Sequence, residues 1–421
     1  MKKCLMTIFL CAVLLLAILP EANITTVFAS ESIELTFSFQ DKEFSFDTSK
    51  NEYSNNFYFS SKAQQRKIAS RIDRAQTLDK LISMGIEPCV ALNYCLPGFK
   101  DFLSNMQNTI ECEPKDATYS FSASYPHFSF KHEKVGYKLD TLELANQIHH
   151  ALVSGENRVN LTPTKILPKV YYDDIKDYNN IRSHFSTTYL DNPNREHNIM
   201  LALRKLDGLT ILPNTEYSFN EIVGKRTQGL GYKEAKIIIG GKYIEGVGGG
   251  VCQVSTTLYN ALLLAGVNIT EVHNHTLASS YVKLGFDAMV NFGIADLKWN
   301  SKLAFPLFVS AKTSLNSVDI TIWGKPNMHQ TIDRVVEIEE EKLPPPDEIV
   351  VDENGEYCSL VEYEDEEAYI QLPHKGYKVR SILEIYENGE LVERKLIRRS
   401  VYSPCAGIKV VGIKKRNNLA E

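Results

Sequence analysis

The chain has 421 residues, of which 43% are hydrophobic, and 46 Lys and Arg against 52 Asp and Glu give a formal net charge of −6 at pH 7. A chain of this length predicts two to four domains. Its slight negative charge is spread over the sequence and provides no basic stripe, which excludes nucleic acid as a partner.

The first residues carry the pattern of a secretory signal peptide. Two lysines precede an apolar run from Cys4 to Leu19, and Val27-Phe28-Ala29 forms a cleavage pattern before Ser30. The run is short for a membrane span, which needs about 20 apolar residues. We therefore expect residues 1–29 to be removed and the chain to be secreted and extracytoplasmic, with membrane attachment only if this segment stays uncleaved.

Two small α+β modules are expected next, over residues 30–105 and 106–175. In the first, the alternating segment "IELTFSFQDKEFSF" predicts strands, and a helix is expected from about Ala63 to Ser83. In the second, "ATYSFSASYPHFSFKHE" predicts strands, followed by a helix from about Leu139 to Val153 that Gly155 ends.

Residues 176–325 are expected to form a mainly antiparallel β domain with one central helix. A first amphipathic helix is predicted around residues 197–205, and residues 235–245 read as a hairpin with a Gly240-Gly241 turn. The central helix is predicted from Cys252 to Ala265, with Gly266 as the terminating glycine. Three strand-like runs follow, "AMVNFGI", "PLFVSAK" and "SVDITIW".

A proline-rich spacer begins the last part of the chain. Leu343-Pro344-Pro345-Pro346 is a stiff linker, and residues 343–421 are expected to form a β-rich module with Asn388-Gly389 as a hairpin turn. The predicted fold class is therefore α+β and multidomain.

Six cysteines remain after signal cleavage: Cys89, Cys95, Cys112, Cys252, Cys358 and Cys405. An even number in a secreted chain permits disulfides, and the pairs considered are Cys89 with Cys95, either of these with Cys112, and Cys358 with Cys405. Connectivity cannot be read from sequence. Cys252 stands alone in its segment.

Cys252 occupies a position that suits a nucleophile. Gly248, Gly249 and Gly250 precede it, and such a loop allows φ > 0 and directs backbone N–H groups inward, as an oxyanion hole requires. Cys252 itself falls in the first turn of the predicted helix, where the helix dipole favours the thiolate. The alternative is a buried structural cysteine.

Two histidines and an aspartate follow as candidate partners. Strand alternation would place His273 and His275 on one face, and Asp287 could orient either imidazole in a Cys/His/Asp relay. The same four side chains could instead form a tetrahedral zinc site. A glycine loop is unnecessary for a structural metal, so we expect no metal and no cofactor.

The segment "NTEYSFNEIVGKRTQGLGYKEAKIIIGGKYIEGVGGGVCQVSTTLYNALLLAGVNITEVHNH" resembles the VanW family. The likeness extends from about Asn214 to Gly324 and includes Gly285 and Asp287. Residues 113–170 resemble a peptidoglycan-binding module that often precedes this domain, and "YENGELVERKLIRRSVYSP" is weakly similar to G5-type β modules of cell-wall proteins.

The resemblance implies a cell-wall protein that acts on peptidoglycan stem peptides and glycan. Some family members are thought to be L,D-transpeptidases with a cysteine nucleophile, which would be Cys252 here, forming 3-3 cross-links with carboxypeptidase activity as a side reaction. Many members have an arginine where this chain has Phe286, so no carboxylate-binding role is expected at that position. Arg226 is the candidate for binding a stem carboxylate, or else a structural ion pair. The competing class is a non-catalytic wall-binding protein with a silent cysteine, and a metal-binding wall hydrolase is a further alternative.

Overall fold

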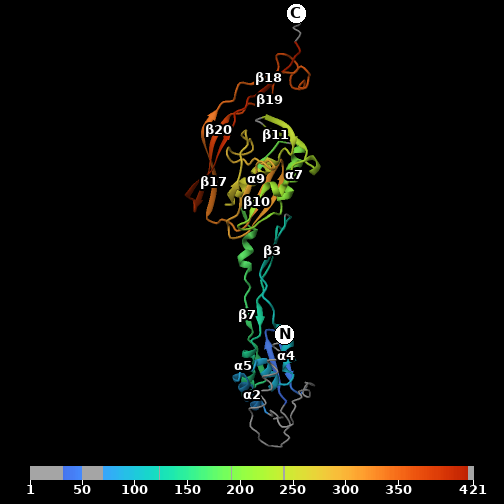
Figure 1. Cartoon of the computed structure of the whole chain (residues 1–421), viewed down its shortest axis with the longest axis vertical. Coiled ribbons are helices and arrows are strands. Elements are labelled where there is room, and N and C mark those ends of the chain that lie inside the picture. The colour runs from blue at the N-terminus through green and yellow to red at the C-terminus, as the bar shows by residue number, and fades with distance from the viewer. Residues whose placement is uncertain (1–31, 50–69, 123, 191, 240–241, 416–421) are drawn as a thin grey trace. The chain divides into compact units, whose positions relative to one another are not determined.

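The computed structural model describes residues 32–49, 70–122, 124–190, 192–239 and 242–415. The signal segment, the expected helical residues 63–69 and the Gly240-Gly241 turn lie outside the described residues. The chain divides into two compact units, one of Met1–Asp116 with Glu133–Lys169 and one of Ala117–His132 with Val170–Glu421 (Figure 1). No helix within the described ranges combines the length and hydropathy that crossing a membrane requires.

The first unit is a small α+β structure with a single core. Its elements are β1 (Glu34–Phe39), β2 (Lys42–Asp47), α2 (Arg71–Ser83), α3 (Pro88–Cys95), α4 (Phe99–Ile110), β5 (Gly136–Lys138), α5 (Thr141–Ser154), β6 (Arg158–Asn160) and β7 (Thr164–Ile166). α2 begins at a capping box of Ser70 and Asp73, and α5 ends at Gly155, whose φ is +78°.

The two expected N-terminal modules share this core. β6, which follows α5, pairs in parallel with β1 in the order β2-β1-β6, so residues from both expected modules lie in one sheet. Leu35 and Phe37 of β1 and Leu144 and Ile148 of α5 belong to the same buried cluster. Sharing lets each short segment bury its apolar face, which neither segment has enough residues to do alone.

The second unit contains the remaining elements. They are β3 (Thr118–Phe121), β4 (Phe128–Lys131), α6 (Tyr172–Ile175), η3 (Lys176–Asn179), β8 (Ile181–Thr188), α7 (Pro193–Leu206), β9 (Thr210–Ile211), β10 (Glu216–Ser218), α8 (Phe219–Val223), η4 (Gln228–Leu230), β11 (Glu234–Ile239), β12 (Lys242–Val247), α9 (Val251–Leu264), β13 (Asn268–Glu271), β14 (Lys298–Asn300), β15 (Leu307–Ser314), β16 (Ser317–Trp323), β17 (Gln330–Lys342), β18 (Glu348–Val351), β19 (Glu367–Gln371), β20 (Gly376–Glu387), β21 (Glu390–Tyr402) and β22 (Ile408–Val411).

An antiparallel sheet of order β8-β16-β15-β9 supports the two long helices of this unit. α9 packs against β8 and β16, α7 packs against β15, and the helices touch each other. α9 also contacts β17, so it lies between α7 and the C-terminal sheet of β17, β20 and β21 (Figure 1). The predicted α+β class and the central helix are confirmed, as are the strands of "PLFVSAK" and "SVDITIW".

One strand prediction around this sheet was wrong, and one strand was not predicted. The "AMVNFGI" segment forms only the isolated bridges of Met289 with His273 and of Asn291 with Ala295. Its backbone is instead held by side chains of α9, as described below. β8 was not predicted, because its charged and polar sequence shows no clear alternation of apolar residues.

The C-terminal strands form two small sheets, β17-β20-β21 and β18-β22-β19. The predicted Asn388-Gly389 turn joins β20 to β21, and both residues have positive φ, at +51° and +87°. Residues 343–347 connect β17 to β18 without regular structure, in agreement with the predicted spacer.

Candidate active site

The glycine loop before α9 is shaped by close packing on three sides. A Cβ on Gly248 would lie 2.8 Å from Arg226 Cβ, one on Gly249 would lie 2.7 Å from the Ala235 carbonyl oxygen, and one on Gly250 would lie 3.0 Å from Ile199 Cγ1. Gly250 is also the N-cap of α9, with φ of +106°. These side-chain-free positions let the loop sit against β11 and α7, which accounts for the glycines without a ligand.

The loop places Cys252 in the first turn of α9 with a free backbone donor. The N–H groups of Val251 and Gln253 donate to the carbonyls of Gly248 and Gly250. The Cys252 N–H has no acceptor among the described residues, as is usual for the first N–H groups of a helix. The Cys252 side chain is half-buried, and its Sγ lies 3.5 Å from the Val290 carbonyl oxygen.

Buried polar side chains of α9 hold the segment that carries Asp287. Ser255 Oγ donates to the Ala288 carbonyl at 2.6 Å, and Thr256 Oγ1 accepts from the Ala288 N–H at 2.9 Å. Asn260 Nδ2 donates to the Phe286 carbonyl at 2.8 Å. These bonds replace the ladder of a regular strand, and they keep Asp287 at a constant place relative to Cys252.

His275 links Cys252 to Asp287. Its Nδ1 lies 2.7 Å from Asp287 Oδ2, and its backbone N–H donates to the same oxygen at 2.6 Å. The imidazole is also the neighbour whose hydrogen bonding and positive charge lower the pKa of the Cys252 thiol. Because Asp287 occupies Nδ1, Nε2 is the ring nitrogen left for the sulfur. Both His275 and Asp287 are buried, so the three side chains form a sheltered Cys/His/Asp chain.

The charges of this chain favour a thiolate and an imidazolium. Burial raises the pKa of Cys252, but the hydrogen bond and charge of His275 outweigh it and leave the pKa below its ordinary value. Burial lowers the pKa of His275, whereas its bonds to Asp287 and Cys252 raise it to a net value of about 10. Burial raises the pKa of Asp287, and the bond and charge of His275 reverse the effect and lower it.

Two residues that the sequence did not single out complete the surroundings of Asp287. Tyr402 Oη donates to Asp287 Oδ1 at 2.5 Å, and Arg398 Nη2 lies 3.0 Å from the same oxygen. Both belong to β21, where Arg398, Ser400 and Tyr402 alternate toward one face. That alternation was the available signal, but it does not reveal which segment the face contacts.

His273 and Phe286 lie in other surroundings. His273 Nε2 pairs with Glu271 at 3.0 Å, and its side chain is 42% exposed, so it belongs to a surface cluster with Lys298 rather than to the cysteine. The two histidines do not share a face because β13 ends at Glu271, so strand alternation does not continue to His275. Phe286 is fully buried and offers no charged group to a substrate.

Arg226 lies beside the glycine loop, and only part of its guanidinium is hydrogen-bonded to the described residues. Its Nη1 donates to Asn220 Oδ1 at 2.7 Å, and its guanidinium lies over the Phe219 ring. Its Nε and Nη2 are buried and have no hydrogen-bond partner among the described residues. Its charge also lowers the pKa of Cys252.

The zinc set considered from the sequence is not assembled. His273 is engaged elsewhere, and in the described part of the chain no three His, Cys, Asp or Glu residues are placed to hold a metal ion. Cys89, Cys95, Cys112, Cys252 and Cys358 are free thiols, so none of the disulfide pairs considered from the sequence is formed.

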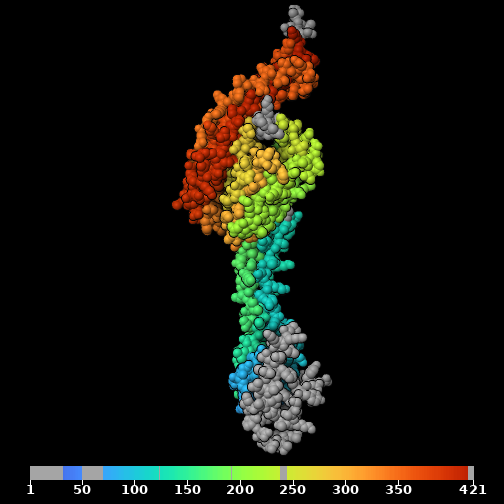
Figure 2. Space-filling view, viewed as in Figure 1, coloured from blue at the N-terminus to red at the C-terminus, as the bar shows by residue number. Residues whose placement is uncertain are grey.

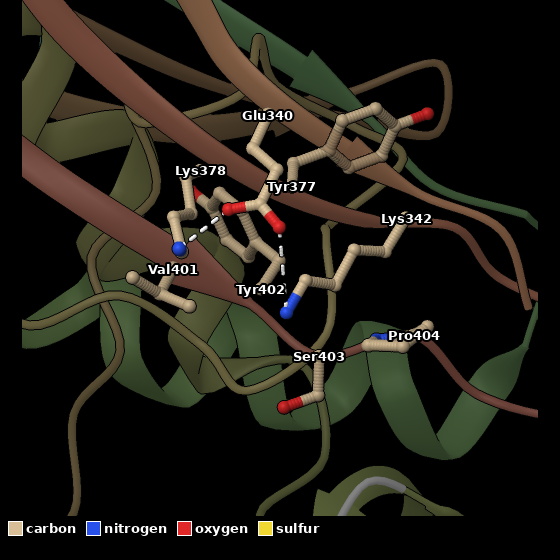
Figure 3. Close-up of a pocket in the computed structure, with 8 residues that line it drawn as sticks. All are labelled: Glu340, Lys342, Tyr377, Lys378, Val401, Tyr402, Ser403 and Pro404. Atoms are coloured by element: carbon tan, nitrogen blue, oxygen red, sulfur yellow. Dashed lines mark ion pairs between the residues drawn. The ribbon is translucent and has the colours of Figure 1, made fainter.

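A pocket of about 90 Å³ lies in the C-terminal sheet (Figure 3). Glu340 faces it and pairs with Lys378 and Lys342, and Tyr402 and Ser403 line it as well. Cys252, His275 and Asp287 do not line this pocket, and its carboxylate is already neutralised by two lysines. We assign it no part in the chemistry.

The family model "VanW like protein" matches residues 194–323, and the model "Putative peptidoglycan binding domain" matches residues 36–160. The chain is 32% identical over 229 residues to YoaR of Bacillus subtilis (strain 168), covering 54% of this chain and 74% of YoaR. It is 29% identical over 140 residues to the vancomycin B-type resistance protein VanW of Enterococcus faecalis (strain ATCC 700802 / V583), covering 32% of this chain and 50% of that protein. The crystal structure of HP0197-G5 matches 20% of this chain and 95% of its own, at 20% identity and a TM-score of 0.11.

Proposed function

Because this chain belongs to the VanW family, we propose that it is a cell-wall L,D-transpeptidase that forms 3-3 peptidoglycan cross-links through a cysteine acyl-enzyme. The observation that carries the proposal is the Cys252–His275–Asp287 chain at the start of α9, in which His275 and Asp287 are buried. A lowered thiol pKa beside a raised imidazole pKa is the arrangement that activates cysteine nucleophiles. The peptidoglycan-binding match over residues 36–160 supports a location at the wall.

In the first half-reaction, the Cys252 thiolate attacks the carbonyl carbon of the L-centred third residue of a tetrapeptide stem. The C–N bond to the terminal D-alanine breaks, a thioester forms, and the His275 imidazolium gives its proton to the departing amine. The Cys252 N–H, for which the described part of the chain offers no acceptor, is available as a donor to the oxyanion, with the glycine-loop amides next to it. Asp287 keeps the imidazole oriented through Nδ1.

In the second half-reaction, an amine of a neighbouring stem attacks the thioester. Neutral His275 accepts the amine proton, the C–S bond breaks, and the thiolate and imidazolium are restored with a new amide bond. Water in place of the amine gives the carboxypeptidase reaction. The Nε and Nη2 of Arg226, which are buried and have no partner among the described residues, support a role in binding the carboxylate of the stem, since a planar guanidinium suits that group.

The test is to incubate residues 30–421 with disaccharide-tetrapeptide fragments and follow the products by mass spectrometry. A dimer that lacks one D-alanine and is linked between third residues supports the proposal if Cys252→Ala abolishes it and Cys95→Ala does not. Cys95 is a suitable control because it is a buried cysteine of the first unit. If neither the wild-type chain nor its variants turn over the substrate while binding to peptidoglycan persists, the chain is a non-catalytic wall-binding protein.

A further inference from the structure

The C-terminal sheet is anchored on the segment that holds Asp287. Arg398 Nη2 donates to the carbonyls of Gly285 and Asp287 at 2.7 and 2.8 Å and to Asp287 Oδ1 at 3.0 Å. Tyr402 Oη accepts from the Gly285 N–H at 2.7 Å, and Ser381 Oγ donates to the Gly285 carbonyl at 2.8 Å. Gly285 thus has both its backbone groups bonded to this sheet.

The contact continues along β17. Arg334 donates to Asn260 Oδ1 of α9, and its guanidinium lies 4.2 Å from the Phe185 ring centroid and 5.4 Å from that of Phe286. The surface view agrees, because the orange and red C-terminal strands lie along the yellow segment that follows α9 (Figure 2). The sheet is therefore part of the same packed body as the Cys/His/Asp chain.

We propose that the C-terminal sheet completes the reactive centre, with Arg398 and Tyr402 as positioning residues that act through Asp287. The side chain of Arg398 is 9% exposed and that of Asp287 is 1% exposed, so this ion pair is shielded from water. A buried carboxylate needs its charge and its lone pairs satisfied to remain ionised and oriented. His275 satisfies Oδ2, whereas Arg398 and Tyr402 satisfy Oδ1.

Loss of these donors should weaken the thiolate at Cys252. Without them, Asp287 can take up a proton or turn away from Nδ1, and His275 then loses the partner that keeps it charged. The titratable and charged groups around the centre are Cys252 and Tyr259 of α9, Arg226, Tyr281, Arg334 of β17, and Arg398 and Tyr402 of β21. Among these, Arg398 is the cation that bonds directly to Asp287.

The experiment measures the rate at which iodoacetamide modifies Cys252 from about pH 5 to pH 9 in the full chain. Tyr402→Phe removes a single oxygen and keeps the ring, and Arg398→Met keeps most of the apolar stem. We expect both to move the midpoint of the pH profile upward by about one unit, which slows modification about tenfold on its rising limb. Arg398→Lys, which keeps the charge, should move it less.

Matched controls come from the same sheet. Tyr386→Phe and Arg394→Met remove a hydroxyl and a guanidinium that bond to Glu384 and Glu337 instead of Asp287, and they should leave the profile unchanged. Thermal unfolding identifies any variant that fails to fold. An unchanged or downward-shifted profile in folded Tyr402→Phe would overturn the inference.

The inference rests on the reactive centre of the proposed function but not on its substrate. Iodoacetamide needs no peptidoglycan, so the two can fail separately. If the pH profile shifts as expected but the protein does not turn over peptidoglycan fragments, the positioning role is supported and the transpeptidase proposal is wrong. If turnover is intact but the profile does not shift, the transpeptidase proposal is supported and the positioning role is wrong.

Discussion

Replacing Gly285 by alanine tests the junction between the candidate active site and the C-terminal sheet. Gly285 has φ of +77°, and a Cβ there would lie 2.0 Å from Ser381 Oγ and 3.2 Å from Val379 Cγ2. The left-handed backbone costs an L-residue about 1–2 kcal/mol. Forcing a methyl group into a packed contact costs typically about 1–3 kcal/mol more. We therefore expect Gly285→Ala to lower the free energy of unfolding by about 2–5 kcal/mol, a large share of the ~5–15 kcal/mol of a typical domain.

The assay is urea unfolding followed by tryptophan fluorescence. The chain has two tryptophans, Trp299 and Trp323, and both lie in the second unit, so the signal reports that unit alone. Gly293→Ala is the matched control. Gly293 has φ of +82° and no atom within 4 Å of the added methyl group, so its substitution should cost the backbone term only.

A double-mutant cycle isolates the steric part. In a Ser381→Ala background the hydroxyl at 2.0 Å is gone and the remaining contacts are 3.2–3.3 Å, so Gly285→Ala should cost clearly less there. If Gly285→Ala costs no more than Gly293→Ala, the sheet does not pack on Gly285 as described. Gly285→Ala should also slow modification of Cys252, because Asp287 lies two residues further on.

Three further predictions concern the site itself. Cys252 should react with iodoacetamide well below pH 8, and His275→Gln should abolish this reactivity at low pH. Cys95, whose pKa burial raises to about 12, should stay unreactive until the protein unfolds. Peptide mass spectrometry measures the modification of both cysteines in one sample. Arg226→Met should weaken binding of a D-alanine-terminated stem peptide by about 1.5–3 kcal/mol in calorimetry, which is the typical contribution of a hydrogen bond to a charged group. The loss of affinity should be smaller for a stem peptide that is amidated at its terminus. The pKa of His275 is raised from 6.5 to about 10, so the stability that its charged form contributes is fully present below pH 6.5 and is lost as the pH rises through about 10. The difference in unfolding free energy between the wild type and His275→Gln should therefore shrink between these two pH values. A difference that stays constant would refute the charged pair.

Much of the local structure could be predicted because it depends on neighbours in sequence. The apolar spacing of residues 254–265 predicted α9, Gly266 marked its end, and Asn388-Gly389 marked a turn whose positive φ values the structure has. Strands β15 and β16 followed from alternation. Cys252 was correctly predicted in the first turn of a helix that follows three glycines.

Other features depended on contacts between distant segments. Strand alternation made His273 and His275 equally good candidates for the partner of Cys252. Because β13 ends at Glu271, His273 instead pairs with Glu271, and His275 pairs with Asp287. The "AMVNFGI" segment reads as a strand by composition, but Ser255, Thr256 and Asn260 of α9 take its backbone bonds.

The sequence by itself determined the helix of Cys252, the glycine loop before it and the identity of its candidate partners, because backbone dihedrals and helix periodicity are local properties. Only the tertiary structure decided which histidine meets the thiol and that Arg398 and Tyr402 hold Asp287 from more than 110 residues away. The physical reason is that an ion pair or a buried hydrogen bond depends on distance in space, and alternation along a strand says which side chains share a face but not what that face contacts.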